Sequence, residues 1–225
     1  MLDIFDILGP VMVGPSSSHT AGAVRIGRMA RVLLGDAPVE ARIGLFGSFA
    51  ETGQGHGTDR ALVSGLLGMK PDDLEIPHSF SLAEERGLRF SFYTANLREA
   101  HPNTAVLEVR DAAGRTLTLQ AASTGGGRIR VDRLNGVDVS FTGMFNTLVV
   151  QHQDIAGKVA DVTQALSSAK INIANMSVCR DRRGGDALMV IETDQIIPDS
   201  AISWLENLDG IIKVTFLNVS GAEDE

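Results

Sequence analysis

Six short elements in a fixed order, between residues 148 and 217, constrain the fold of this chain more than any other feature of its sequence. Apolar residues run together or alternate in four segments and recur at helical spacing in two. This predicts strands at 148–152, 171–180, 186–193 and 211–217, and helices at 157–168 and 199–207. The order is that of a split βαβ, ferredoxin-like domain with both helices on one face of the sheet. The other face then has to be covered, commonly by a partner domain.

The segment before residue 146 differs, because glycine, serine and threonine are frequent in it. A helix is expected over Ala21–Leu34, with an apolar stripe of Val24, Met29, Val32 and Leu33 and with Gly35 as its end. A second helix is expected over 58–67, with Thr58 as N-cap and Gly68 as terminator. Strands are expected at 40–46, 88–93, 104–110, 116–122 and 129–134, the third and fourth joined by a turn at 111–114. We therefore expect an α+β chain with an N-terminal α/β domain, 1–145, and a βαββαβ domain, 146–220.

Composition narrows the class of protein. The net charge of −8 argues against broad nucleic-acid binding and against docking on an anionic membrane. No apolar run approaches the roughly 18–20 residues of a membrane span, and the N-terminus lacks the basic start of a signal peptide, so a cytoplasmic location is expected. The only cysteine, Cys179, is expected to pack in a strand. One thiol cannot supply the three or four thiolates that an iron–sulfur cluster needs, and no metal site is expected in this chain.

The segment Gly14-Pro15-Ser16-Ser17-Ser18-His19-Thr20 stands at the start of the first expected helix. Hydroxyls there can cap free backbone N–H groups, and the same donors can hold a carboxylate. Three serines and a histidine exceed what one cap requires, and an imidazole can move a proton. We favour a ligand or catalytic site over the alternative, an over-furnished N-cap. It is not a P-loop, because the Gly-Lys-Ser/Thr end is missing.

A second segment, 47–59, is rich in glycine and ends with His56 and Asp59 at the start of the next expected helix. We expect the segment to be a loop in which the backbone can approach a ligand. His56 and Asp59 are expected to be close enough to form a hydrogen bond, and a carboxylate that orients a histidine is a common catalytic arrangement. The alternative is a plain connection in which Asp59 is a first-turn helix acid.

Two further polar segments lie in the first domain: His101-Pro102-Asn103, and Ser123 to Gly127, which includes Gly125 and Gly126. Each alone is more often a turn than a site. Four glycine-dense polar segments in one domain are hard to explain by folding alone, because glycine costs backbone entropy. We expect all four to line one cleft.

In the second domain, Asp154-Ile155-Ala156-Gly157 joins the first strand to its helix, and Asn172 opens the second strand. Free N–H groups at the helix start could bind the carboxylate of an amino acid. The alternative is a tight turn in which Asp154 caps the helix. Trp204 is expected to pack its helix against the sheet.

Taken together, the segments 14–20, 47–59, 101–103 and 123–127 resemble the β subunit of the bacterial two-chain, iron–sulfur-dependent L-serine dehydratases. Residues 148–219 resemble an ACT domain, the amino-acid-sensing regulatory module. The first domain is also similar to the allosteric-substrate-binding domain of some phosphoglycerate dehydrogenases. The first loop of the ACT-like segment reads Ala156-Gly157 where Pro-Gly is usual. Whether this domain binds serine or only dimerises is therefore left open.

The resemblance implies a lyase of amino-acid metabolism that converts L-serine to pyruvate and ammonia, with a [4Fe-4S] cluster held by an α subunit. The open iron would act as a Lewis acid on the substrate hydroxyl, and a base would remove the α-proton. The expected partners are that α subunit, L-serine as substrate and effector, and a second copy of this chain bound through either domain. Candidate catalytic residues are Ser16, Ser17, Ser18, His19, Thr20, His56 and Asp59. Candidate substrate- or effector-binding residues are His101, Asn103, Gly125, Gly126, Asp154, Ile155, Ala156, Gly157 and Asn172.

A rival interpretation makes the chain a regulatory module that senses serine while the partner performs all the chemistry. A third possibility is a scaffold that only completes the partner's fold, but the surplus of polar groups in the four segments argues against it.

Overall fold

The computed structural model describes residues 12–14 and 16–218 and divides into two compact units, Met1–Asn135 and Gly136–Glu225. The domain limit expected before Asn146 lies beyond this division, and the interval between them holds strand β6 (Val137–Phe141). In the part of the chain that is described, no helix has the length and apolar character needed to cross a membrane.

The first sheet has the strand order β2-β1-β3-β4-β5-β6. Strand β1 (Pro38–Phe46) pairs in parallel with β2 (Arg89–Thr94) and antiparallel with β3 (Thr104–Asp111). Strands β4 (Thr116–Gly125) and β5 (Arg128–Leu134) continue the sheet in antiparallel fashion. The five strands expected before residue 135 and the turn between β3 and β4 are confirmed, and β6 is additional.

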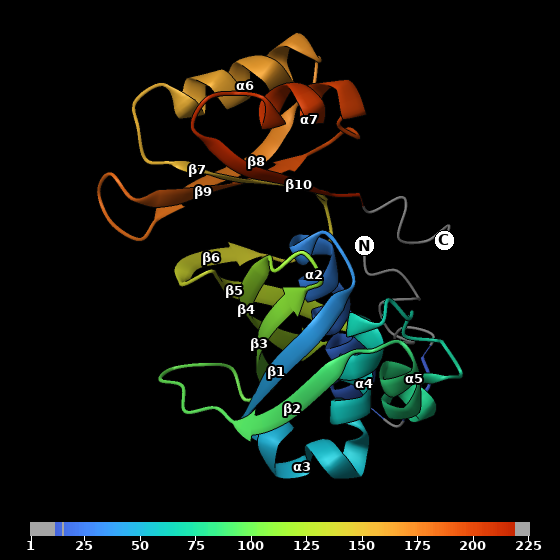
Figure 1. The fold of residues 1–225 in the computed structure, drawn as a ribbon. Helices are drawn as coiled ribbons and strands as arrows, with labels where there is room; N and C mark the ends of the chain where they lie inside the picture. The colour runs from blue at the N-terminus through green and yellow to red at the C-terminus, as the bar shows by residue number, and fades with distance from the viewer. Residues whose placement is uncertain (1–11, 15, 219–225) are drawn as a thin grey trace, which may run out of the picture. The chain divides into compact units, whose positions relative to one another are not determined.

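The helices of this unit are α2 (Ala23–Leu34), α3 (Ser48–His56), α4 (Thr58–Leu66) and α5 (Ser79–Glu85), together with the short turns η1 (Ser17–Gly22) and η2 (Ile76–His78). Helices α2 and α4 lie side by side on one face of the sheet (Figure 1). Their backbones approach closely because Gly27 and Gly65 face each other, and a Cβ at Gly27 would lie 2.3 Å from the carbonyl oxygen of Leu62. Glycine at these two positions therefore allows the two helix backbones to approach each other closely.

Helix α2 ends at Gly35 as expected, in the left-handed conformation that glycine adopts without strain. Two expectations for these helices are wrong. Val32 does not belong to the buried stripe, because it is 44% exposed. Thr58 is the first residue of α4 and not its cap; Gly57 precedes the helix at a φ of 71°.

The opposite face of the first sheet carries charged and polar side chains. Tyr93 donates a hydrogen bond to Glu108, and the guanidinium of Arg42 stacks 4.3 Å from the centroid of the Tyr93 ring. Glu40 pairs with Arg110 on the neighbouring strand. A largely antiparallel sheet with one apolar and one polar face can leave the polar face in water.

The second unit contains β7 (Asn146–Gln153), α6 (Lys158–Ser168), β8 (Ile173–Arg180), β9 (Asp186–Thr193), α7 (Asp199–Glu206) and β10 (Ile211–Leu217). Its sheet has the order β10-β7-β9-β8, in which all neighbouring strands are antiparallel, and both helices cover the same face (Figure 1). The core between them is built on Leu148, Val150, Val162, Met189 and Ile191. The predicted ferredoxin-like order is confirmed, and a turn over 181–185 joins β8 to the antiparallel β9.

Trp204 on α7 is an exception, since it is 48% exposed and does not fill the space between helix and sheet. Its neighbour Leu205, fully buried, occupies the core position instead.

Candidate active site

The serine-rich segment forms a single π-helical turn. Ser16, in extended conformation, is the N-cap of η1, and its Oγ accepts the backbone N–H of His19 at 3.3 Å. The same Oγ lies 3.3 Å from Nδ1 of His19. The predicted cap is therefore present, but the residues from Ser17 to Thr20 are already helical and not a loop. Pro15 lies outside the described residues. π-turns of this kind often occur at functional sites.

The other ring nitrogen of His19 contacts two hydroxyls of α3. Nε2 lies 3.1 Å from Oγ1 of Thr52 and 3.2 Å from Oγ of Ser48. The Thr52 hydroxyl donates its single hydrogen to the carbonyl oxygen of Ser48, at 2.8 Å, so it can only accept from His19. This network assigns the proton to Nε2 and leaves the lone pair of Nδ1 to accept the hydroxyl hydrogen of Ser16.

Two rings surround the imidazole of His19. The Phe49 ring, fully buried, meets it edge to face with centroids 5.3 Å apart, and the His56 ring lies 5.0 Å away. Burial lowers the pKa of His19 below its ordinary value, and the nearby charge of His56 lowers it further. A hydrogen bond with the backbone of Ser48 opposes these effects in part. His19 is thus held as a neutral base near neutral pH.

The remaining hydroxyls of the segment differ in exposure. Thr20 is 3% exposed, and its Oγ1 is a buried oxygen with no hydrogen-bond partner among the described residues. Ser17 and Ser18 are half-buried. They are therefore closer to the surface than Thr20 and are better placed to meet a ligand.

The structure brings the four polar segments together. Gly47 adjoins Pro102, because a Cβ at Gly47 would lie 2.7 Å from the Pro102 carbonyl oxygen. The backbone N–H of Ser123 donates to the carbonyl of Asn103 at 2.9 Å, and Ser123 packs against Gly22 of η1. The four segments are thus neighbours, and that they line one cleft stays a prediction. Gly125, the last residue of β4, and Gly126, in the turn to β5, also have a folding role, since both have positive φ angles, 98° and 59°.

Two expectations for the segment 47–59 are wrong. Residues 48–56 form helix α3 and not a loop. The ring of His56 lies tilted against that of His19, at 59°, and does not pair with Asp59, whose carboxylate accepts the backbone N–H of Arg60 at 2.8 Å. Asp59 thus fits its alternative role as an acidic residue in the first turn of a helix.

His101 has a structural partner within its own segment. Its Nδ1 accepts the backbone N–H of Asn103 at 3.1 Å, and its carbonyl oxygen accepts the hydroxyl of Thr104 at 2.7 Å. These bonds fix the turn that leads into β3. His101 itself is half-buried.

The candidate residues of the second unit lie at two ends of its sheet. The carboxylate of Asp154 binds Arg180 at 2.8 Å and the N–H of Gly184 at 2.9 Å, which ties the β7–α6 turn to the β8–β9 hairpin. Asn172 bonds Asp194 beside the start of β8. Because Asn146 pairs with Thr193 and Gln153 with Asp186, the length of β7 separates the two, roughly 20 Å at ~3.3 Å per residue.

Asp154 does not cap helix α6, because the residue at that position is Gly157, with a φ of 97°. The exposed part of this turn is Ile155-Ala156-Gly157, and Ile155 is 48% exposed. A ligand of this turn would therefore meet its backbone and the Ile155 side chain more directly than the carboxylate of Asp154.

Within the described residues, no group of three or more histidine, cysteine or acidic side chains is placed to hold a metal ion. Cys179 is half-buried on β8. The donor set therefore does not fit an iron–sulfur cluster in this part of the chain.

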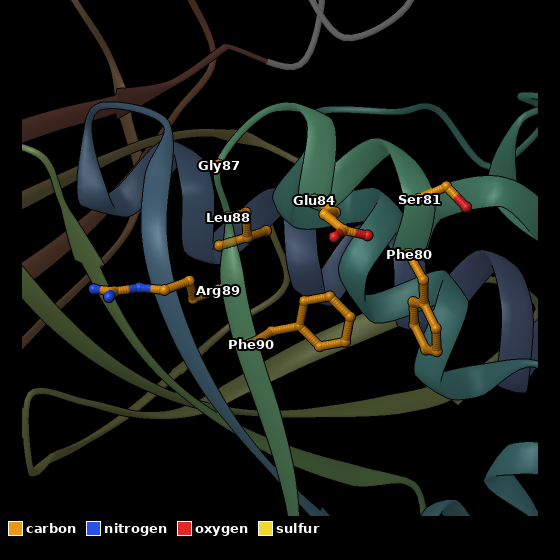
Figure 2. A pocket seen from close by; sticks show the side chains of 7 residues that line it. All are labelled: Phe80, Ser81, Glu84, Gly87, Leu88, Arg89 and Phe90. Atoms are coloured by element: carbon orange, nitrogen blue, oxygen red, sulfur yellow. The ribbon is translucent and has the colours of Figure 1, made fainter.

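A shallow pocket of about 530 Å³ lies elsewhere, between α5 and the start of β2. Phe80 and Glu84 come from the helix, Leu88 directly precedes the strand and Phe90 belongs to it, and Arg89 points to the other side of β2 (Figure 2). None of the residues that the sequence singles out lines it.

Sequence reasoning missed Ser48, Phe49 and Thr52 as partners of His19. The spacing of Ser48 and Thr52 by four residues would have placed them on one face of a helix. The glycines at 53 and 55 disfavour a helix there, and so concealed this signal.

Comparison with known proteins follows the division seen in the sequence. Residues 1–89 match the family described as serine dehydratase beta chain, and residues 146–210 match the ACT domain. A probable L-serine dehydratase beta chain of Bacillus subtilis is 44% identical over 212 residues, which cover 94% of this chain and 96% of that protein. The L-serine dehydratase beta chain of Peptoniphilus asaccharolyticus is 33% identical over 216 residues, covering 96% and 97%. A D-3-phosphoglycerate dehydrogenase of Bacillus subtilis is 28% identical over 161 residues, covering 71% of this chain and 30% of that protein.

Proposed function

Because this chain belongs to the family of L-serine dehydratase beta chains, we propose that it supplies His19 as a proton-transfer group to an enzyme that converts L-serine to pyruvate and ammonia. The observation that carries the proposal is that both nitrogens of this imidazole form hydrogen bonds, Nδ1 with Ser16 and Nε2 with Thr52 and Ser48. Hydrogen bonds at both ring nitrogens fix the orientation and the tautomer of a histidine base.

The chemistry requires a group that accepts the α-proton of serine. In neutral His19 the ring nitrogen without a proton is Nδ1, and the lowered pKa of His19 keeps it unprotonated near neutral pH. Loss of the α-proton and of the β-hydroxyl as water gives an enamine, which tautomerises to the imine and is hydrolysed to pyruvate and ammonia. Nδ1 contacts the Ser16 hydroxyl, so Ser16 either yields its place to the substrate or passes the proton on.

The neighbouring hydroxyls are proposed to hold the substrate. Ser17 and Ser18 are half-buried next to His19, where they can donate hydrogen bonds to a carboxylate. Thr20, whose buried Oγ1 has no hydrogen-bond partner in the described part of the chain, is proposed to support the turn from its buried side. His56 is proposed to act through its charge on His19, whereas Asp59, His101, Asn103, Gly125 and Gly126 are proposed to shape the surrounding backbone.

The iron–sulfur cluster is proposed to be held by a second, α chain. The lone Cys179 supports this division, because one thiolate cannot anchor the cluster. The designation beta chain in the two full-length relatives also supports an α partner. When bound, the cluster supplies a Lewis acid for the substrate hydroxyl.

The test uses the two-chain enzyme reconstituted with His19→Ala. We expect kcat to fall by ~10²–10⁴-fold, the usual contribution of a positioned base. The matched control is His78→Ala, which removes an exposed histidine outside the four segments and should leave kcat and KM unchanged. An enzyme whose His19→Ala form keeps both constants would refute the catalytic role.

For the second unit we propose a regulatory role, with the division placed before residue 146, where the ACT similarity begins. The exposed turn Ile155-Ala156-Gly157 is the proposed contact for serine as an effector, and a second copy of the chain the proposed partner. A purely sensing chain is not favoured, because the His19 arrangement would then have no use. Calorimetric titration of serine into the chain alone separates the two, since tight binding without the α chain would favour the sensor.

A further inference from the structure

Gly22 and Ser123 meet at the back of the π-turn. A Cβ at Gly22 would lie 2.1 Å from Oγ and 2.7 Å from Cβ of Ser123, far inside any tolerable contact. The next atom, the carbonyl oxygen of Ser17, would be at an ordinary 3.6 Å. Only a residue without a side chain can therefore occupy position 22 while Ser123 faces it, and Ser123 itself is completely buried.

Ser123 is held in turn by the segment that leads into β3. Its backbone N–H donates to the carbonyl of Asn103, and the backbone N–H of Asn103 donates to Nδ1 of His101. The intervening residue, Pro102, accepts the backbone N–H of Phe49 at 3.4 Å. The side chain that faces Gly22 is thus fixed to the same turn that fixes the start of α3.

This chain of contacts ends at His19. Phe49 packs its ring edge against the imidazole, and Gly47 allows Pro102 to approach the start of α3. From His19 the backbone of η1 leads back to Gly22. The contacts therefore run in a closed loop from Gly22 through Ser123 and Phe49 to His19. In the Gly22–Ser123 contact, a buried side chain packs directly on the backbone of η1.

We infer that Gly22 and Ser123 are positioning residues, which set the rotation of the π-turn so that His19 points Nε2 at Thr52 and Nδ1 at Ser16. The inference rests on the proposed function in so far as His19 moves a proton. Neither residue contacts the imidazole. Each acts through the turn, because a shift of η1 away from β4 would carry His19 away from the two hydroxyls of α3.

The test exchanges the side-chain sizes at positions 22 and 123. Gly22→Ala introduces the clash, Ser123→Gly removes the side chain that sets the distance, and the double variant restores the contact with its atoms on the other side. Each single variant should disturb His19, and the double variant should recover it, as expected for coupled neighbours. Gly65→Ala is the matched control, because its Cβ would meet the Val24 carbonyl at 2.1 Å, an equally severe clash between α2 and α4.

The first readout is the ¹⁵N and ¹H NMR signature of His19 in the full chain labelled at histidine. The unmodified chain should show one tautomer, protonated at Nε2, with a pKa below the ordinary value. Gly22→Ala and Ser123→Gly should each give mixed tautomers and a raised pKa. In the two-chain enzyme, kcat/KM should fall by up to about 10²-fold, as for small misplacements of a catalytic group, with recovery in the double variant.

Unchanged His19 signals in Gly22→Ala would overturn the inference, as would a double variant that stays disturbed. If Gly22→Ala does not fold, Ser123→Thr presses a larger side chain on the same glycine and replaces it, with the same expected result. Gly65→Ala should lower stability but disturb the His19 tautomer less than Gly22→Ala does, and an equal or larger change of tautomer there would count against the inference. The NMR result does not depend on turnover, so failure of the proposed function would be recognised separately.

Discussion

The imidazoles of His19 and His56 lie 5.0 Å apart, centroid to centroid, and the charge of His56 lowers the pKa of His19. Burial makes the larger contribution. We expect His56→Ala to raise the pKa of His19 without restoring its ordinary value, because burial remains. An NMR titration of the His19 ring protons measures the shift, with His78→Ala as control. A pKa that stays in place would show that His56 exerts no electrostatic effect.

The same shift makes stability depend on pH. The pKa of His19 is lower in the folded chain than its ordinary value of 6.5, so the unfolded chain binds more protons between the two values. The free energy of unfolding therefore decreases as the pH falls through this window. Well above pH 6.5, the titration of His19 no longer makes it depend on pH. Denaturant unfolding at several pH values should show a weaker dependence in His19→Ala, and an identical dependence would contradict the expectation.

Ser16 has two roles that one substitution removes. Ser16→Ala loses the N-cap of η1, at a cost of ~1 kcal/mol, and the hydrogen bond to Nδ1 of His19. Ser16→Thr keeps the hydroxyl and should retain most of the free energy of unfolding. Ser18→Ala, whose hydroxyl makes no recorded bond among the described residues, should change it by less than about 0.5 kcal/mol. Equal losses for Ser16→Ala and Ser18→Ala would argue against a specific cap.

Asp154 links two turns of the second unit. The N–H of Gly184 and the guanidinium of Arg180 lower the pKa of its carboxyl below the ordinary 3.8. Its contribution to stability is therefore present above that value and is lost as the pH falls through the lowered pKa. Asp154→Asn should lower the melting temperature of the second unit near neutral pH and less so in acid. Asp199→Asn, outside this link, is the control.

The core of the second unit gives a quantitative check. Leu148 is fully buried between the sheet and the helices, so Leu148→Ala should cost about 2–5 kcal/mol. Val178→Ala, at a position that is 49% exposed, should cost less than about 0.5 kcal/mol. Chemical denaturation followed by the fluorescence of Trp204, the only tryptophan, reports on this unit. A small effect at Leu148 would place it outside the core.

The second unit was predictable because each element has its own signal. Strands β9 and β10 have the bounds expected from the sequence, and the hairpin between β8 and β9 falls on a glycine pair. The prediction for Trp204 was wrong. A large apolar residue is expected inside, but Leu205 occupies the buried position on the same helix.

The site was predictable in part. Ser16 and His19 stand in one short segment, so their relation is visible in the sequence. Ser48 and Thr52 are brought to His19 only by the path of β1 and α3, and glycines that cost roughly 1 kcal/mol each in a helix concealed α3. Burial of Phe49 supplies tertiary packing that local preference does not record.

The π-turn η1 contains about one residue more than an α-helical turn would hold. Helix α2 follows it directly and is locked in phase with α4 through Gly27 and Gly65. Deleting any one residue between Ser17 and Gly22 would therefore leave α2 in place and rotate the preceding side chains by roughly 100° about the axis. The number of residues in this turn, independently of their identity, thus decides which side chain faces Thr52, and chain length here is as strict a requirement as the histidine.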